Sequence, residues 1–438
     1  KKGRFNQPLR LEVNSSLTFT SKLDLYSLPA ISSEDYITVE QTLFNAGYYD
    51  EYILNDWYYH HPFTPAVQTF IDREMGLISA QDSLKRIDLL KQTDSRSEFQ
   101  KYFLRSGFNQ QYAINLRGGS DKHAYLFGVG YDKNLGVRHD VYNRLNLRVQ
   151  NIFRPIKNFQ LEIGAYYTHS TDKSGRGANY NIVGKPIPYL KFTNADGSPA
   201  SLPVSLSDIY TDTAGAGKLL DWKYYPLEDW KHDKQTSKQE DIMANISVGY
   251  RFLKYFQIDA RYQYQRQNRT TERHLGMGSF YTRDMINRFT QLNYNTGIVK
   301  YIIPMGGILE RSTASVNSQS MRTQLNFNKR WSKHELTAIA GAEVREIINN
   351  SGSYSIYGYN EDPLTTAPVD FVNQYPDFVT GQYGITEGIP GRPMITTRNN
   401  RFISTYANAA YTYSQRYIFS ISGRRDGSNV FGATTNDK

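Results

Sequence analysis

The stretch FQLEIGAYYTHS (159–170) alternates between apolar and polar side chains. One side of an extended chain would carry Phe159, Leu161, Ile163, Ala165 and Tyr167, and the other Gln160, Glu162, Gly164, Tyr166 and Thr168. Successive side chains of a β-strand point to opposite faces, so this period of two predicts a strand with one apolar and one wet face. The stretch is too polar for a strand that is buried on both faces.

Composition favours strands over Leu-rich helices. Only 39% of the 438 residues are hydrophobic, yet the chain has 35 Tyr and 22 Phe, residues that suit strands and amphipathic interfaces. The mean hydropathy is -0.60. With no cysteine, a disulfide framework, a thiolate metal site and a cysteine nucleophile are excluded. A net charge of +9 is modest for this length and does not call for a nucleic-acid partner.

No run in the sequence approaches the roughly 20 apolar residues of a membrane-spanning helix. The opening KKGRFNQPLR has no apolar segment behind its charges, so we do not expect it to be a signal peptide. The protein is therefore either soluble or crosses a membrane with strands, whose alternation hides their apolar half from a hydropathy window.

Strict alternation recurs in eleven segments, most of them close to the ~10 residues that a tilted strand needs to cross a bilayer. They are 9–20, 111–119, 123–132, 142–151, 159–168, 241–252, 256–267, 320–329, 335–346, 402–413 and 417–425.

The connections between these segments alternate in length. Short ones lie at 120–122, 152–158, 253–255, 330–334 and 414–416, whereas the longer ones lie at about 21–110, 133–141, 169–240, 268–319 and 347–401, of which 133–141 has only about ten residues. All tight turns would then lie at one end of the strands, as in outer-membrane barrels. We therefore predict an all-β, transmembrane antiparallel β-barrel. A soluble sandwich or propeller is the alternative, but its connections rarely sort by parity.

The two faces differ in charge. The polar face carries most of the strand arginines, among them Arg10, Arg117, Arg144, Arg148, Arg251, Arg261, Arg322, Arg345 and Arg424. A charge facing lipid near the midplane costs ~2 to 4 kcal/mol, whereas one facing a wet lumen costs little. We expect membrane lipid outside and water inside, with lumen-facing Arg117, Arg144, Arg148, Arg261, Arg322, Arg345 and Arg424. These cations either form a solvated ladder with cross-strand carboxylates or also guide an anionic substrate.

The long loops contain helix signals. SSEDYITVEQTLFNAG (32–47) opens with a capping box from Ser32 to Asp35, and the helix would set Tyr36, Val39 and Leu43 on one face. Ser79 and Asp82 repeat the cap in SAQDSLKRIDLLK. Loops of this length with helices of their own usually carry function.

Catalytic patterns are not found. Carboxylates are scattered over loops, and neither a Gly-x-Ser-x-Gly nor a His-Glu-x-x-His pattern occurs. Neighbouring His60 and His61 would point apart on a strand and have no acidic cluster beside them, so a solvated loop is the better interpretation. We predict a protein that is not an enzyme, with no metal and no cofactor.

Recognition residues are sought instead in two aromatic stretches, DWYYHHPF (56–63) and DWKYYPLEDW (221–230). They supply the candidate substrate-binding residues Trp57, Tyr58, Tyr59, Trp222, Tyr224 and Trp230, together with Tyr225. Flat rings that stack on sugar faces beside carboxylates would explain them. Packing of the loops against each other or against a partner is the alternative, and it is favoured.

Several segments resemble the SusC/RagA family of TonB-dependent outer-membrane transporters. GGSDKHAYLFGVGYDKNLG (118–136) closely resembles a family signature, and YNRLNLRVQNIFRPIKNFQLEIGAYYT (142–168) looks like the hairpin that follows it. RYIFSISGRRDGSNVFG (416–432) is similar to a further signature, and KKG (1–3) resembles the end of the plug domain. The matches follow the family's order along the whole chain.

The resemblance implies a 22-stranded barrel filled by a plug, a SusD-like surface lipoprotein as lid, and energy from the TonB complex. The function implied is active import of nutrient oligomers, oligosaccharides or oligopeptides, across the outer membrane of a Gram-negative cell. The eleven strands of 1–438 would form the N-terminal half of that barrel, with signal and plug domain absent. An open sheet would leave two edges unpaired in lipid, so a companion segment must close it.

Two positions depart from the family pattern. Asn408 in TYANAAYTY stands where an Arg is expected, and Val430 stands where an Arg often follows Asp-Gly-Ser. No substrate charge can therefore be carried over from the family. Two other functions stay open: a soluble or surface-attached β-rich glycan-binding module, and a passive porin.

Overall fold

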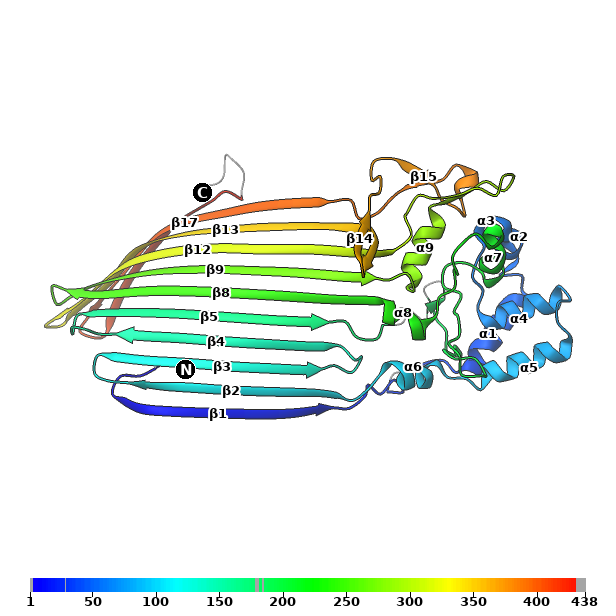
Figure 1. Cartoon of the computed structure of the whole chain (residues 1–438). Helices are drawn as coiled ribbons and strands as arrows, with labels where there is room; N and C mark the ends of the chain where they lie inside the picture. The colour runs from blue at the N-terminus through cyan, green and yellow to red at the C-terminus, as the bar shows by residue number, and fades with distance from the viewer. Residues whose placement is uncertain (1–2, 28, 178–180, 183–184, 431–438) are drawn as a thin grey trace.

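The computed structural model describes residues 3–27, 29–177, 181–182 and 185–430. Lys1 and Lys2 of the KKG stretch, and Phe431 and Gly432 of the last family-like segment, lie outside the described residues. Eleven strands form one antiparallel sheet in chain order, so the predicted all-β class and strand count are confirmed (Figure 1). They are β1 (Gln7–Thr20), β2 (Gly107–Gly119), β3 (His123–Leu135), β4 (Val141–Phe153), β5 (Phe159–Lys173), β8 (Asp233–Phe252), β9 (Phe256–Leu275), β12 (Gly307–Trp331), β13 (His334–Glu361), β17 (Met394–Tyr413) and β18 (Tyr417–Ser428).

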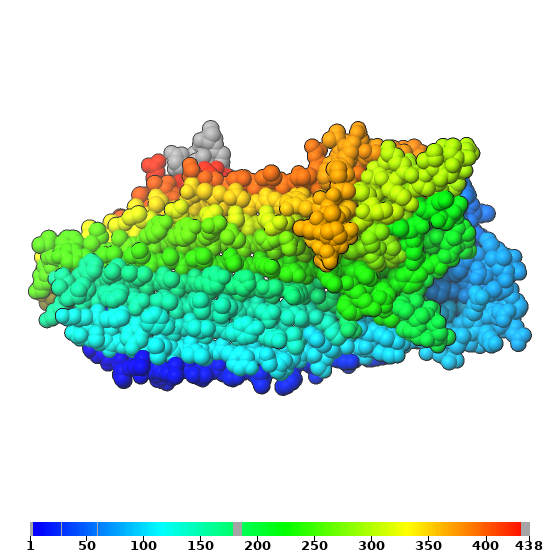
Figure 2. All heavy atoms as spheres, viewed as in Figure 1, coloured from blue at the N-terminus to red at the C-terminus, as the bar shows by residue number. Residues whose placement is uncertain are grey.

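The sheet is open, with β1 and β18 as its edges, and one short strand, β14 (Leu364–Ala367), pairs with β13 beside the main path. The tight turns lie at one end of the long strands, except the five-residue turn 136–140 between β3 and β4, and the helices and long connections lie at the other end (Figure 1). We call the second group the loop layer: residues 21–106, 174–232, 276–306 and 362–393. Figure 2 shows its atoms gathered at one end of the long sheet.

The strands are longer than alternation predicts, and this corrects the expected loop bounds. β8 begins at Asp233 instead of 241, and β13 continues to Glu361 instead of 346. The third and fourth loops are correspondingly reduced to 276–306 and 362–393. The added strand segments are rich in Ser, Thr, Asn and Gln. In these segments the backbone hydrogen bonds of the sheet continue although neither face of the strand is apolar. A search for alternation therefore cannot detect them.

The loop layer holds the helices. They are α1 (Ser33–Asn45), α2 (Asp50–Leu54), α3 (Asp56–Tyr59), α4 (Pro65–Glu74), α5 (Ala80–Lys91), α6 (Ser95–Phe103), α7 (Asp208–Thr213), η1 (Ala214–Gly217), α8 (Pro226–His232), α9 (Phe280–Arg288) and η2 (Gly381–Tyr383). Three short hairpins accompany them: β6 (Asn181–Ile182) with β7 (Lys185–Pro186), β10 (Thr290–Leu292) with β11 (Val299–Tyr301), and β15 (Gln374–Pro376) with β16 (Thr386–Gly388). None of the described helices is both long and apolar enough to cross a bilayer.

Both predicted helix caps are present. Ser32 caps α1 by accepting a hydrogen bond from the Asp35 N–H at 3.0 Å, and Ser79 caps α5 in the same way. The predicted apolar face of α1 is wrong as a burial face, because Val39 is exposed whereas Ile37 and Glu40 are buried. Glu40 is drawn inward because its carboxylate accepts hydrogen bonds from Thr64 and from the hydroxyl of Tyr189.

The dry core lies in the loop layer and not in the sheet. One cluster gathers α1, α4, α5 and α6 around Phe103, Tyr189 and Phe192, each fully buried. A second joins α9 to the tops of β9, β12 and β13 through Leu275, Ile286 and other apolar residues. The apolar rows of the sheet are instead exposed: Val13, Ile114 and Val129 are 48–64% accessible.

Candidate functional site: a cavity under the loop layer

A cavity of about 520 Å³ lies where the loop layer meets the sheet. Its walls include the aromatic side chains of Tyr224, Trp230, Phe280 and Tyr281, and the polar side chains of Ser174, Asp229, Asp233, Gln235 and Arg273. In the register, Gln235, Arg273 and Glu310 lie opposite one another on β8, β9 and β12. They fall on the same face as Arg261 and Arg322, so the cavity continues the arginine-bearing face of the sheet.

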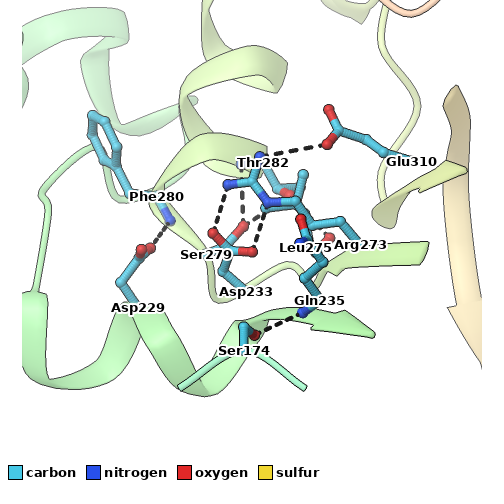
Figure 3. A network of polar contacts seen from close by, with 10 residues as sticks. All are labelled: Ser174, Asp229, Asp233, Gln235, Arg273, Leu275, Ser279, Phe280, Thr282 and Glu310. Atoms are coloured by element: carbon cyan, nitrogen blue, oxygen red, sulfur yellow. Dashed lines mark hydrogen bonds and ion pairs between the residues drawn. The ribbon is translucent and has the colours of Figure 1, made fainter. Parts of the chain in front are cut away.

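An ion-pair network forms one wall of the cavity (Figure 3). Asp233 accepts two hydrogen bonds from Arg273, from Nε at 2.8 Å and from Nη2 at 2.6 Å. The remaining nitrogen, Nη1 of Arg273, lies 3.4 Å from Glu310. A planar guanidinium fits a carboxylate in this two-point geometry, so three strands are tied together at their upper ends.

The helix α9 is fixed to the same network. Ser279 caps it by accepting from the Thr282 N–H, and Thr282 donates its hydroxyl proton to the Leu275 carbonyl at 3.0 Å. Asp229, in the first turn of α8, accepts the Phe280 N–H at 2.6 Å (Figure 3). Burial raises the pKa of Asp229, and the Phe280 N–H partly offsets that rise. α8 and α9 are therefore held side by side over the cavity.

Chemically, the cavity combines aromatic faces with carboxylates. Arg273 is occupied by Asp233 and Glu310, and the Asp229 carboxylate lines the wall with no cation bonded to it among the described residues. Such a lining stacks on flat, weakly polar surfaces and accepts hydrogen bonds from hydroxyl, amide or ammonium groups. It shows no arrangement of nucleophile and base.

The structure places the aromatic candidate residues of the stretch 221–230 in two different environments. Tyr224 and Trp230 line the cavity. Trp222 is 3% exposed, packs with Leu206 and Val379, and donates its indole N–H to Asp284 at 2.8 Å, so it serves loop packing.

The other aromatic stretch lies elsewhere in the loop layer. Trp57 is 62% exposed, and both Trp57 and Tyr58 contact the ring of Tyr383, with centroid distances of 5.7 and 4.5 Å. The side chain of Tyr59 lies outside the described part of the structure. His60 stacks on the ring of Tyr210 at a centroid distance of 3.6 Å, so it is packed within the loop layer and the expected solvated loop is wrong here. The two stretches therefore do not form one site.

Several cavity residues were missed by sequence reasoning. Asp229 lies inside the quoted aromatic stretch and Asp233 three residues after it, so acids next to aromatics were a usable signal. Arg273, Phe280 and Tyr281 lie 40 or more residues further along the chain, and only the pairing of β8 with β9 brings them there.

The predicted lumen arginines lie on the face opposite the exposed apolar rows. Five of them make polar contacts across or along the strands: Arg117 with Glu12 at 2.5 Å, Arg144 with Asp132 at 2.9 Å, Arg148 with Gln150 at 3.1 Å, Arg322 with Tyr406 at 2.8 Å and Arg424 with Asp426 at 2.8 Å. Arg261 lies opposite Arg322, and Arg345 opposite Ser320. This pattern is that of a charge ladder along one face.

A second cavity, of about 540 Å³, lies within the loop layer away from the sheet. It is lined by Phe63, Leu90, Tyr189 and other residues of the first two long loops, with the Asp72–Arg86 pair at 3.4 Å on its wall. It does not continue the polar face of the sheet, so we place the candidate site at the first cavity.

Comparison with known proteins shows which solved structures share this fold. No protein-family model and no curated protein matches the sequence. Among solved structures, the RagAB peptide transporter aligns with 100% of this chain at a TM-score of 0.66 and 15% identity. The RagAB peptide importer aligns equally completely in its open-open state (TM-score 0.64, 16% identity) and closed-closed state (0.63, 14%). In each case the chain spans 44% of the solved chain. The chain therefore has the fold of the SusC/RagA-type transporters, as the resemblance in its sequence predicts.

Proposed function

We propose that this chain forms about half of a 22-stranded barrel in the outer membrane of a Gram-negative cell. The barrel acts in TonB-dependent import of a nutrient oligomer, with a SusD-like surface lipoprotein over the loop layer. The cavity under the loops is the first ligand site on the lumen side. No bond of the ligand is made or broken.

The observation that carries this proposal is the upper border of the apolar rows. On each strand from β3 to β17, the central apolar row of the outer face is interrupted, on the way to the loop layer, by a charged, imidazole or amide side chain. The border residues are Tyr131, Leu145, Tyr167, Ile242, Tyr264, Met321, Val344 and Ile403, and the polar residues that follow are Lys133, Asn143, His169, Glu240, Arg266, Gln319, Glu346 and Arg401.

The border is a staircase relative to the strand register. Leu145 lies opposite His169, so the border drops by two residues from β4 to β5. It drops by two again from β8 to β9, where Ile242 lies opposite Arg266. From β9 to β12 it drops by two once more, where Tyr264 lies opposite Gln319. From β12 to β17 it stays level.

A flat membrane surface explains the staircase if the strands are tilted. A shift of six residues over the five steps from β3 to β12, at ~3.3 Å per residue and ~4.8 Å per strand, corresponds to a tilt of about 40°. Extending the count to β17 gives about 30° over seven steps. Membrane barrels tilt their strands by ~35–45°. On tilted strands this staircase becomes a straight border parallel to the membrane plane. A packed protein interior would not require such a border, and this disfavours the soluble glycan-binding module.

The two open edges support a larger barrel. β1 and β18 each present unpaired backbone groups, and each unsatisfied group in lipid costs several kcal/mol. The solved RagAB chains are more than twice as long as the aligned region, which leaves room for as many strands again. Those chains belong to complexes described as peptide transporters, which favours oligopeptide over oligosaccharide as the cargo and supports a lipoprotein lid.

The test combines a membrane measurement with an uptake measurement. The complete protein should require detergent to stay monodisperse, and uptake of the co-purified ligand should stop in cells that lack TonB. A monodisperse, folded protein without detergent would contradict the membrane barrel. Undiminished uptake without TonB would leave the barrel but make it a passive porin.

A further inference from the structure

Three segments of the chain meet at the turn between β3 and β4. Arg105, just before β2, donates its backbone N–H to the Val137 carbonyl at 2.8 Å and its Nε–H to the Gly136 carbonyl at 3.1 Å. From the other side, the Arg176 N–H, just after β5, bonds the Arg138 carbonyl at 2.6 Å.

The approach of the third segment is unusually close. A Cβ on Gly175 would lie 2.1 Å from the Arg138 carbonyl oxygen and 2.5 Å from the Asp140 nitrogen, so only glycine fits there. Backbone contacts therefore bring the three arginines to one turn, and two of their guanidinium groups also donate to carbonyls: Arg105 to Gly136, and Arg176 through Nη1 to Tyr102 at 3.0 Å.

The junction concentrates positive charge. Arg105, Arg138 and Arg176 form no ion pair with any carboxylate of the described residues. Nη2 of Arg105 is buried without a hydrogen-bond partner there. His139, at the tip of the turn with φ of 68°, has its pKa lowered by burial and then by Arg176, Arg105 and Lys22. The acid that acts against them is Asp140.

We propose that this junction binds an oxyanion, a phosphate or carboxylate group, between the guanidinium groups of Arg105, Arg138 and Arg176. A buried donor without an acceptor is destabilising, and like charges held together repel each other, so an anion relieves both penalties at once. Guanidinium groups bind such groups through two parallel hydrogen bonds. The proposal does not depend on the transport function.

The junction adjoins the candidate cavity. The guanidinium carbon of Arg176 lies 4.6 Å from the ring centroid of Trp230, and Gly175 and Gly177 line the cavity wall. A ligand in the cavity could therefore place an anionic group on the junction and cationic or hydroxyl groups near Asp229. Trp230 also provides an optical probe, because its ring touches one of the proposed ligating residues.

The experiment titrates the complete protein in detergent with inorganic phosphate at constant ionic strength and follows tryptophan fluorescence. We expect saturable binding, weakened at least about fivefold by Arg138→Gln. The Arg138 side chain is exposed and forms no hydrogen bond with the described residues, so this variant should fold normally. Arg392→Gln removes an equally exposed arginine of the last long loop and is the matched control, expected to leave the affinity unchanged.

A pH series adds an independent readout. Protonation of His139 adds a cation beside Lys22, Arg105, Arg176 and Asp140, so the affinity for sulfate, whose charge stays constant, should rise as the pH falls through the lowered pKa of His139. His139→Gln should flatten that rise. A rise in affinity at low pH that is present in the natural chain and reduced in His139→Gln would assign binding to the junction. General attraction of anions to a basic protein would give the same rise in both proteins.

A lipid headgroup and a soluble ligand carry the same chemistry, so the titration is repeated after phospholipid removal, with native mass spectrometry as the check. Saturation in the protein as purified assigns the site to a soluble oxyanion. Saturation only after lipid removal assigns it to a lipid phosphate. Absence of saturable binding in both, or equal affinity of Arg138→Gln and the control, overturns the proposal.

Discussion

Asp233, the first residue of β8, is held by Arg273 of β9 through two parallel hydrogen bonds of 2.8 and 2.6 Å. The two residues are 40 positions apart and meet because β8 and β9 are paired with Asp233 opposite Leu275. This contact anchors the loop layer to the end of the sheet, because the next residues on one side form α8 and, on the other, the approach to α9 (Figure 3).

Removal of this anchor should lower stability. Arg273→Gln leaves Asp233 and Glu310 without their cation, and because both carboxylates are partly exposed we expect a loss of about 1–2 kcal/mol. Arg330→Gln breaks a longer, exposed contact of 3.8 Å to Glu335 and should cost less than about 0.5 kcal/mol. Thermal unfolding in detergent checks both, and equal midpoints for the two variants would contradict the anchoring role.

The lipid-facing rows can be tested with adjacent residues. Ile246 lies in the apolar row between Ile163 and Tyr262, and Asn245 points to the other face. Ile246→Arg should cost about 2–4 kcal/mol in a bilayer, whereas Asn245→Arg should cost less than about 1 kcal/mol. The measurement is the fraction of each variant that reaches the outer membrane in folded, protease-resistant form. Similar losses for both substitutions would contradict lipid contact on one face.

The buried carboxylate of the cavity predicts a pH effect. Burial raises the pKa of Asp229 above its value in the unfolded chain, so the folded state binds the proton more tightly. Stability associated with Asp229 is therefore full below the unfolded pKa and falls as the pH rises through the folded pKa.

Asp229→Asn should remove that pH dependence, because an amide oxygen still accepts the Phe280 N–H but does not ionise. The variant should be more stable than the natural chain at pH 7 and equal to it at pH 3. Unfolding midpoints measured across this range decide the matter, and a parallel pH profile for the two proteins would show that Asp229 does not titrate abnormally.

Replacement of two tryptophans from the quoted aromatic stretches should change stability by very different amounts. Trp222→Ala empties a packed site and leaves Asp284 without its indole donor, so we expect a loss of about 3–5 kcal/mol. Trp57→Ala removes an exposed ring and should change stability by less than about 0.5 kcal/mol. If Trp57 contacts ligand, the less favoured of the two interpretations of its sequence setting, binding of the co-purified ligand should weaken in Trp57→Ala at unchanged stability. Unfolding of the loop layer by Trp57→Ala would contradict its exposed position.

Helix caps were local enough to be predicted. Ser32 and Ser79 act within three residues of themselves, so neighbouring sequence is sufficient. The buried face of α1 was not predictable in this way, since Glu40 is buried through partners 24 and 149 residues away. Likewise, Trp222 and Trp57 occur in similar aromatic stretches, yet only the packed loop layer decides that one is core and the other is surface.

The strands, their order and the end at which most turns lie can be predicted from local sequence, because a period of two and a short connection are encoded within about ten residues. The folded chain is needed to show where the strands end in water, that Arg273 meets Asp233, and that Arg105, Arg138 and Arg176 lie at one turn. Those features depend on pairings between distant segments, and polar ladders and close backbone contacts leave no periodic signal in the chain.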